Sequence, residues 1–151
     1  SKPEMEEFDL SERVERVVNY LMKRMPSLGK KVELINDIQP GISIKANGSL
    51  LAWSIENIIR NGIDAIDRED GKVTVSLRKD ENAIKIRIQD NGKGIPKKDW
   101  RNIFRPGFST KRAGWGLGLS LSTRIVEEIH SGRLHVIESS PKNGTIIEIS
   151  F

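Results

Sequence analysis

A glycine-rich segment that runs directly into a helical pattern constrains the fold most. Glycines stand at every second position from Gly114 to Gly118, and glycine lets a backbone turn tightly and approach a ligand closely. From Leu117 to Ile129 apolar residues recur every four positions, which predicts an amphipathic helix over about residues 117–131. A helix that begins at such a loop presents free N–H groups to a phosphate. The alternative is a tight loop before a core helix.

The spacing of the glycines excludes two common phosphate-binding loops. The segment does not have the G-x-x-x-x-G-K-[ST] pattern of a P-loop. It also lacks the G-x-G-x-x-G pattern that follows the first strand of a dinucleotide-binding fold. Another nucleotide-binding architecture is therefore required.

Composition is that of an ordinary globular protein. The 151 residues, of which 36% are hydrophobic and 30% charged, suffice for one domain with a substantial core. No apolar run is long enough for a transmembrane helix or signal peptide, and the absence of cysteine excludes disulfides and thiolate metal sites. We expect a cytoplasmic location, with any membrane anchor elsewhere in a longer parent protein. The net charge of +4 reflects a mild excess of basic over acidic residues. The densest run of basic residues, 93–111, adjoins the glycine loop, which favours a phosphate ligand over nucleic acid.

Periodicity divides the chain into helices and strands. We expect residues 1–8 to be a disordered linker or terminal remnant, and residues 9–151 to form one domain. The i, i+3, i+4 spacing of apolar residues between Val14 and Met25 predicts a first helix, with Asp9 or Ser11 as its candidate cap. A second helix is expected over about residues 48–67. Strands are expected at 32–38, 73–77, 84–88, 134–139 and 145–151.

Two segments carry candidate site residues. In the second helix, Asn57, Asn61 and Asp64 fall within about 60° of one another at 100° per residue. Gly62, in the middle of this helix, costs about 1 kcal/mol relative to alanine, so we expect a ligand or backbone close by; the alternative is an exposed polar face. Asp90, at a strand end before two glycines, can direct a carboxylate into a cleft; the alternative is a plain Asn-Gly turn. Residues 96–113 have little periodicity and are a candidate lid.

In this order, the segments resemble the ATP-binding catalytic domain of sensor histidine kinases. Their superfamily also holds gyrase, mismatch-repair and heat-shock chaperone ATPases. Residues 56–65 are similar to the family's N box and residues 90–94 to its first glycine box. Residues 103–111 look like the phenylalanine box and lid, and residues 114–118 like the second glycine box. The Asn-Gly-Thr at 143–145, before the last strand, is also typical of the family.

The resemblance implies a role for each matching residue. Asn61 would bind Mg²⁺ through its side-chain oxygen, with Asn57 near the phosphates. Asp90 would accept a hydrogen bond from the adenine amino group, which guanine lacks at that position. Lys111 would reach the terminal phosphate and, with Asn57 and Asn61, serve catalysis. The other implied nucleotide contacts are Asp64, Gly92, Gly94, Ile95, Thr110, Gly114, Trp115, Gly116, Leu117, Gly118, Leu119 and Thr145.

Two positions depart from relatives in the superfamily. Hydrolytic members place a glutamate four residues before the metal-binding asparagine, whereas here Asn57 stands there and Glu56 is turned away by about 100°. Because asparagine cannot act as a general base, the pocket suits phosphate transfer to a protein nucleophile. Many sensor kinases carry a Lys-Tyr pair where Asp64 and Ala65 stand, so an aromatic stack on adenine is missing here.

The family's phosphoacceptor histidine lies on a separate helical-hairpin dimerisation domain. Of the two histidines here, the pattern places His130 at a helix end and His135 in a strand. We therefore expect a catalytic module of a longer kinase, monomeric in isolation and without nucleic-acid or membrane contacts. It would bind Mg-ATP and donate the γ-phosphate to a histidine of the phosphoacceptor domain, with a response regulator downstream. The alternatives are a non-transferring ATP-binding sensor or scaffold module, or a Ser/Thr-directed or hydrolytic ATPase of the same superfamily. The expected fold is a two-layer α/β sandwich with a mixed, mainly antiparallel sheet and three main helices on one face.

Overall fold

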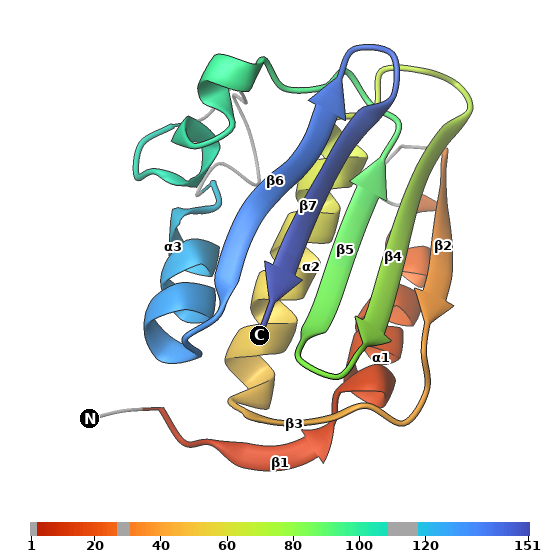
Figure 1. Cartoon of the computed structure of the whole chain (residues 1–151). Coiled ribbons are helices and arrows are strands. Elements are labelled where there is room, and N and C mark those ends of the chain that lie inside the picture. Colours follow the sequence, from red (N-terminus) through yellow and green to blue (C-terminus); the bar gives the residue numbers. More distant parts are fainter. Residues whose placement is uncertain (1–2, 27–30, 109–117) are drawn as a thin grey trace.

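The computed structural model describes residues 3–26, 31–108 and 118–151 as a two-layer α/β sandwich. Helices cover one face of a five-stranded sheet (Figure 1), whose strand order is β2-β4-β5-β7-β6. Only β2 and β4 pair in parallel, and the other neighbours are antiparallel. The predicted mixed, mainly antiparallel sheet is thus confirmed. Its strands are β2 (Val32–Ile38), β4 (Gly71–Lys79), β5 (Ile84–Asp90), β6 (Arg133–Ser140) and β7 (Gly144–Ser150).

The first helix, α1 (Leu10–Arg24), packs its apolar stripe into the core. Asp9 caps it, because the Asp9 carboxylate accepts the N–H of Glu12 at 3.0 Å. Ser11, the other candidate cap, has a different role. Its hydroxyl donates to the carbonyl of Gln39 at 2.6 Å and accepts the N–H of Ile42 at 3.0 Å, which joins α1 to the loop before strand β3 (Ser43–Ala46).

The second helix, α2 (Gly48–Asp64), is capped by Asn47, which accepts the N–H of Leu50 at 3.0 Å. It ends three residues before the predicted boundary of 67. The carbonyl of Ala65 accepts the N–H of Lys93 at 2.9 Å, so the chain leaves the helix to meet the loop after β5. The end of α2 is therefore determined by a distant contact.

A small antiparallel ribbon, which periodicity did not predict, lies beside the N-terminus of α2 (Figure 1). It consists of β1 (Glu6–Asp9) and β3 (Ser43–Ala46). The two strands are four residues each, too short for a hydrophobic period to be recognised. Glu7 stands opposite Lys45 in the register, an opposite-charge pair across the ribbon.

The third helix differs from the single regular helix expected over 117–131. It comprises α3 (Ser120–Thr123) followed by six residues of π-helix, Arg124–Ile129. The wider π turn changes which residues share a face. Leu121, expected in the apolar stripe, is 41% exposed, whereas Ile125 and Val126 are buried.

Candidate functional site

A cavity of about 590 Å³ lies between α2, the loop after β5 and the start of α3. Its walls combine buried apolar side chains of α2 and the sheet with a few polar groups. This composition is typical of a small-molecule site. The predicted site residues that line it are Asn61, Asp90, Gly94, Ile95, Gly118, Leu119 and Thr145.

Asp90 is the buried carboxylate of this cavity. It ends β5, and its side chain is only 5% exposed. One carboxylate oxygen, Oδ1, accepts the N–H of Gly92 at 2.8 Å. Since a buried charge must be hydrogen-bonded to persist, this main-chain bond fixes the carboxylate at the wall of the cavity.

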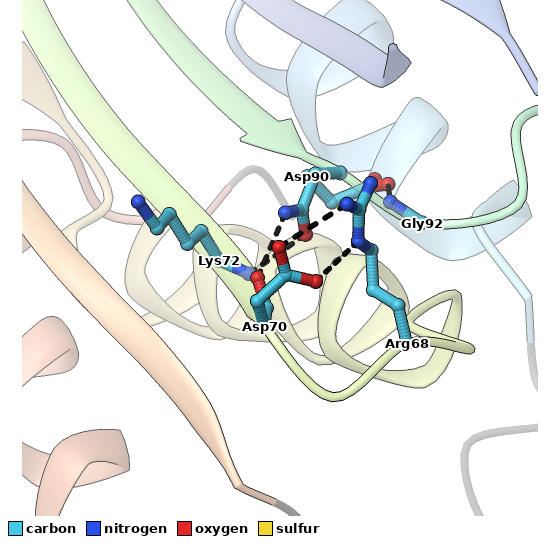
Figure 2. A network of polar contacts seen from close by, with 6 residues as sticks. Arg68, Asp70, Lys72, Asp90 and Gly92 are labelled. Atoms are coloured by element: carbon cyan, nitrogen blue, oxygen red, sulfur yellow. Dashed lines mark hydrogen bonds and ion pairs between the residues drawn. The ribbon is translucent and has the colours of Figure 1, made fainter. Parts of the chain in front are cut away.

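A polar network positions the loop that carries Asp90 (Figure 2). The Asn91 side chain accepts the N–H of Lys72 at 2.7 Å and donates to the carbonyl of Asp70 at 3.0 Å. Arg68 in turn donates two hydrogen bonds to the Asp70 carboxylate, at 2.6 and 3.2 Å. The Arg68 hydrogen bond lowers the pKa of Asp70. Asn91 was not among the predicted site residues, although it lies within the glycine-box motif.

The two glycines after Asp90 are required by neighbouring backbone. A Cβ at Gly92 would collide with the carbonyl of Ala65. Gly94 has φ +78° and faces the carbonyl of Ser140, with 2.5 Å between that oxygen and an added Cβ. Both glycines thus allow the loop to pack against α2 and β6. Gly94 also lines the cavity, whereas Gly92 does not.

Hydroxyl groups hold the next part of the loop. The N–H of Ile95 donates to Ser139 Oγ at 2.7 Å, and Ser139 Oγ lies 2.7 Å from Thr145 Oγ1. Thr145 is buried and stands opposite Asp90 in the β5–β7 register. These contacts bring the ends of β5, β6 and β7 together at one edge of the cavity.

The polar residues on one side of α2 have different positions and contacts. Asn61 lines the cavity. One turn earlier, Asn57 Nδ2 donates to the carbonyl of Gly118 at 3.1 Å and lies 3.4 Å from Ser122 Oγ, so it ties α2 to the start of α3. Asp64 ends α2 and does not line the cavity. Glu56 accepts a hydrogen bond from Arg60 at 3.1 Å, also away from the cavity lining.

Several wall residues were not predicted, and six predicted residues cannot be placed. The unpredicted residues include Ile58, Ala65, Ile88 and Ile147, which a hydrophobic pattern assigns to the core, and Lys93, which adds a cation. The predicted residues that lie outside the described part of the chain are Thr110, Lys111, Gly114, Trp115, Gly116 and Leu117.

Oxygen ligands for a divalent cation are few in the described residues, among which no group of three or more His, Cys, Asp or Glu side chains gathers. The amide oxygen of Asn61 at the cavity is a suitable hard ligand. This donor set fits Mg²⁺ that takes most of its ligands from nucleotide phosphates and water, as that ion usually does.

Both histidines lie away from the cavity lining. His130 Nε2 accepts the N–H of Asn47 at 3.0 Å, and Nδ1 lies 2.8 Å from the carbonyl of Ile125, so Nδ1 carries the proton. His135 stands on β6, 3.9 Å from Glu148. Burial, with the positive charge of Arg133, lowers the pKa of His135. These positions suit structural roles for both side chains.

The fold and cavity define a nucleotide-binding α/β sandwich, and comparison with known proteins identifies the class. Residues 47–151 match the family described as histidine kinase-, DNA gyrase B-, and HSP90-like ATPase. The chain belongs to this family, which is one of ATP-binding proteins. The resemblance to histidine kinase catalytic domains is thereby confirmed, together with the fold.

Two particular relatives are sporulation kinases. The chain is 37% identical over 110 residues to Sporulation kinase A of Bacillus subtilis, covering 73% of this chain and 18% of that protein. It is 31% identical over 153 residues to Sporulation kinase D of the same organism, covering 99% of this chain and 29% of that protein. The chain therefore spans less than a third of either relative.

A solved structure confirms the architecture. The catalytic domain of histidine kinase ThkA, in a nucleotide-free form, superposes with a TM-score of 0.85 at 23% identity, covering 98% of this chain and 95% of that one. At this identity the likeness concerns the fold. Within the described residues, no helix has the length and apolar character needed to cross a membrane.

Proposed function

We propose that the cavity binds Mg-ATP and presents its γ-phosphate to a histidine on a separate dimerisation and phosphoacceptor domain. The observation that carries this proposal is Asp90, a buried carboxylate fixed by the Gly92 N–H at the wall of a mainly apolar cavity. A carboxylate accepts from the exocyclic amine of adenine and repels the carbonyl of guanine. The apolar side chains of Ile58, Ile88 and Ile147 form walls suited to a flat base.

The polar end of the cavity suits the phosphates. Asn61, on α2, supplies an amide oxygen to Mg²⁺, and Gly118 and Leu119 lead into α3. Magnesium neutralises charge on the phosphates when it is bound. In the transfer, the bond between the γ-phosphorus and the β–γ bridging oxygen breaks, a bond from phosphorus to an imidazole nitrogen forms, and ADP leaves. Positioning and charge neutralisation are the main contributions to such a reaction.

On α2, the position one turn before Asn61 holds no glutamate, which favours transfer to protein over hydrolysis. The residue one turn before Asn61 is Asn57, which holds the Gly118 carbonyl and cannot remove a proton from water. The nearest glutamate on α2, Glu56, is paired with Arg60. A hydrolytic or Ser/Thr-directed ATPase, or a non-transferring ATP-binding scaffold, is therefore the second choice.

Phosphate transfer to a supplied acceptor domain tests this function. The chain is mixed with radiolabelled ATP, Mg²⁺ and a helical-hairpin phosphoacceptor domain taken from a sporulation kinase relative. We expect an acid-labile, base-stable phosphohistidine on the hairpin, and its loss with Asn61→Ala. Release of inorganic phosphate without labelled hairpin would contradict transfer and favour hydrolysis; nucleotide binding with neither product would favour the scaffold. A response regulator, added last, is proposed to take the phosphate from the hairpin.

A further inference from the structure

A second groove lies along β6, an edge strand of the sheet in the described part of the chain. Strand β6 is the last strand in the sheet order, and Figure 1 shows it next to α3. The groove, of about 640 Å³, is bounded by β6, by residues 97–105 and by Thr123 and Glu127 of the third helix. It shares no lining residue with the nucleotide cavity.

The groove is strongly cationic. Among the residues that line it, Glu127 is the acidic one, against a large set of bases: Lys97, Lys98, Arg101, Arg105 and Arg133. Within the described residues, none of these five bases forms an ion pair. Five bases beside one carboxylate leave a net positive charge in the groove, so an anionic occupant would be stabilised here.

The floor of the groove offers main-chain groups. The N–H of Leu134 points away from β7 and donates to the Glu127 carboxylate at 3.2 Å. By the alternation of an antiparallel pair, the N–H of Val136 points to the same side, immediately before the β-bulge that interrupts the pairing between Val136 and Glu138. The side chains of Leu134 and Val136 are buried, so the edge presents backbone rather than apolar side chains. Unpaired strand edges accept extended segments as an additional strand.

We propose that this groove binds an acidic segment of a partner protein, which pairs in extended form with β6 while its carboxylates contact the basic walls. The contact between Glu127 and Leu134 is an internal example of a carboxylate at this edge. A protein segment fits better than single-stranded nucleic acid, which needs aromatic faces for its bases. The two aromatic residues of the groove lining, Trp100 and Phe104, also pack against the core. The Trp100 ring is engaged by Lys97, whose Nζ lies 5.7 Å from the ring centroid, and Trp100 Nε1 donates to the carbonyl of Ile95 at 2.9 Å.

A labelled peptide of alternating glutamate and threonine, about seven residues long like a short strand, is the probe. Its binding is measured by fluorescence anisotropy at two salt concentrations. The matched probe has the same sequence with alternate backbone amides N-methylated, which keeps the charge and prevents strand pairing. We expect the methylated peptide to bind about tenfold more weakly or worse, and both to weaken with salt.

Charge reversal locates the site. Arg101→Glu with Arg133→Glu changes two exposed bases on opposite sides of the groove. We expect it to weaken peptide binding by about tenfold or more, while Lys45→Glu, on exposed β3, leaves binding unchanged. If the Arg101→Glu, Arg133→Glu double variant melts at a lower temperature than the wild type, the double variant Arg101→Gln, Arg133→Gln is used in its place.

Several results would overturn the proposal. If the methylated and unmethylated peptides bind with equal affinity, the groove is only a charged patch and strand pairing is refuted. If the Arg101 and Arg133 substitutions leave the affinity unchanged, the peptide binds elsewhere. Tighter binding of an oligothymidine than of the peptide would assign the groove to nucleic acid. No binding of the peptide at low salt would also refute it.

Discussion

Asp90 faces Gly62 across the gap between β5 and α2: a methyl group added at Gly62 would lie 3.7 Å from Asp90 Oδ2 and 3.6 Å from its Cβ. These are ordinary contact distances, so the fold has room for a methyl group there. Gly62 nevertheless lines the cavity beside Asp90. The space at Gly62 is therefore available to a ligand.

Gly62→Ala should lower the affinity for ATP without lowering the free energy of unfolding. Replacing a mid-helix glycine by alanine favours the helix by about 1 kcal/mol, so we expect the free energy of unfolding to rise or stay level. The added methyl group narrows the cavity, so ATP affinity should fall. Denaturant unfolding and calorimetric titration with ATP measure the two quantities. Lower stability with unchanged affinity would show that the space serves packing only.

Asn61→Ala should remove the magnesium dependence of ATP binding. At about a hundred times its dissociation constant, a ligand adds roughly 2.7 kcal/mol to stability, which thermal melting detects. In the wild type we expect a larger ATP-induced shift with Mg²⁺ than with EDTA. In Asn61→Ala the two shifts should coincide. A variant that keeps the wild-type difference would show that Asn61 is not a metal ligand.

His130 joins the beginning of α2 to the end of the third helix through Asn47 and Ile125. His130→Ala leaves the N–H of Asn47 without its partner, whereas the carbonyl of Ile125 keeps the main-chain N–H of residue 130. We expect a cost of about 1–3 kcal/mol of unfolding free energy. Asn82→Ala, in an exposed turn, is the control and should change stability by less than about 0.5 kcal/mol. Equal effects of the two substitutions in urea unfolding would contradict a bridging role.

His135 should make the protein less stable in mild acid. Its folded-state pKa lies below the ordinary value of 6.5, chiefly because of burial and then because of Arg133, although Glu148 acts in the opposite direction. The unfolded chain therefore binds this proton more tightly, so stability is complete above pH 6.5 and falls as the pH drops below it.

Chemical unfolding between about pH 8 and pH 5, a range that spans the ordinary histidine pKa, measures this contribution. His135→Gln should have a shallower loss of stability toward acid than the wild type. Identical slopes for the two proteins would assign the acid sensitivity to other groups.

Much of the architecture was predictable because local periodicity and burial coincide. The β2 boundaries, Val32–Ile38, agree with the predicted strand, and the alternation in β4 and β5 gives their buried faces. The third helix shows the limit of this reasoning. The four-residue spacing that includes Leu121 does not determine which side of the helix faces the core: Leu119, Ser122 and Val126 are buried, whereas Leu121 is 41% exposed.

The sequence predicted the polar residues of the candidate site better than the apolar residues that form its walls. Asp90 and Asn61 carry distinctive chemistry and both line the cavity. Apolar wall residues such as Ile88 follow the same strand period as core residues, so the sequence does not distinguish them. Asn57 shares a helix face with Asn61, yet its hydrogen bond to Gly118 depends on a segment about sixty positions away, which helix geometry alone does not specify.

Calorimetric titration of the wild type and Asp90→Asn with ATP and GTP tests the central claim most directly. Asparagine retains an oxygen for the Gly92 N–H, so melting should show that the variant folds. We expect wild-type ATP affinity to exceed GTP affinity, and Asp90→Asn to lose about tenfold or more in ATP affinity, equivalent to roughly 1.4 kcal/mol or more. An unchanged ATP dissociation constant in a folded Asp90→Asn variant would contradict the assignment of this cavity to adenine.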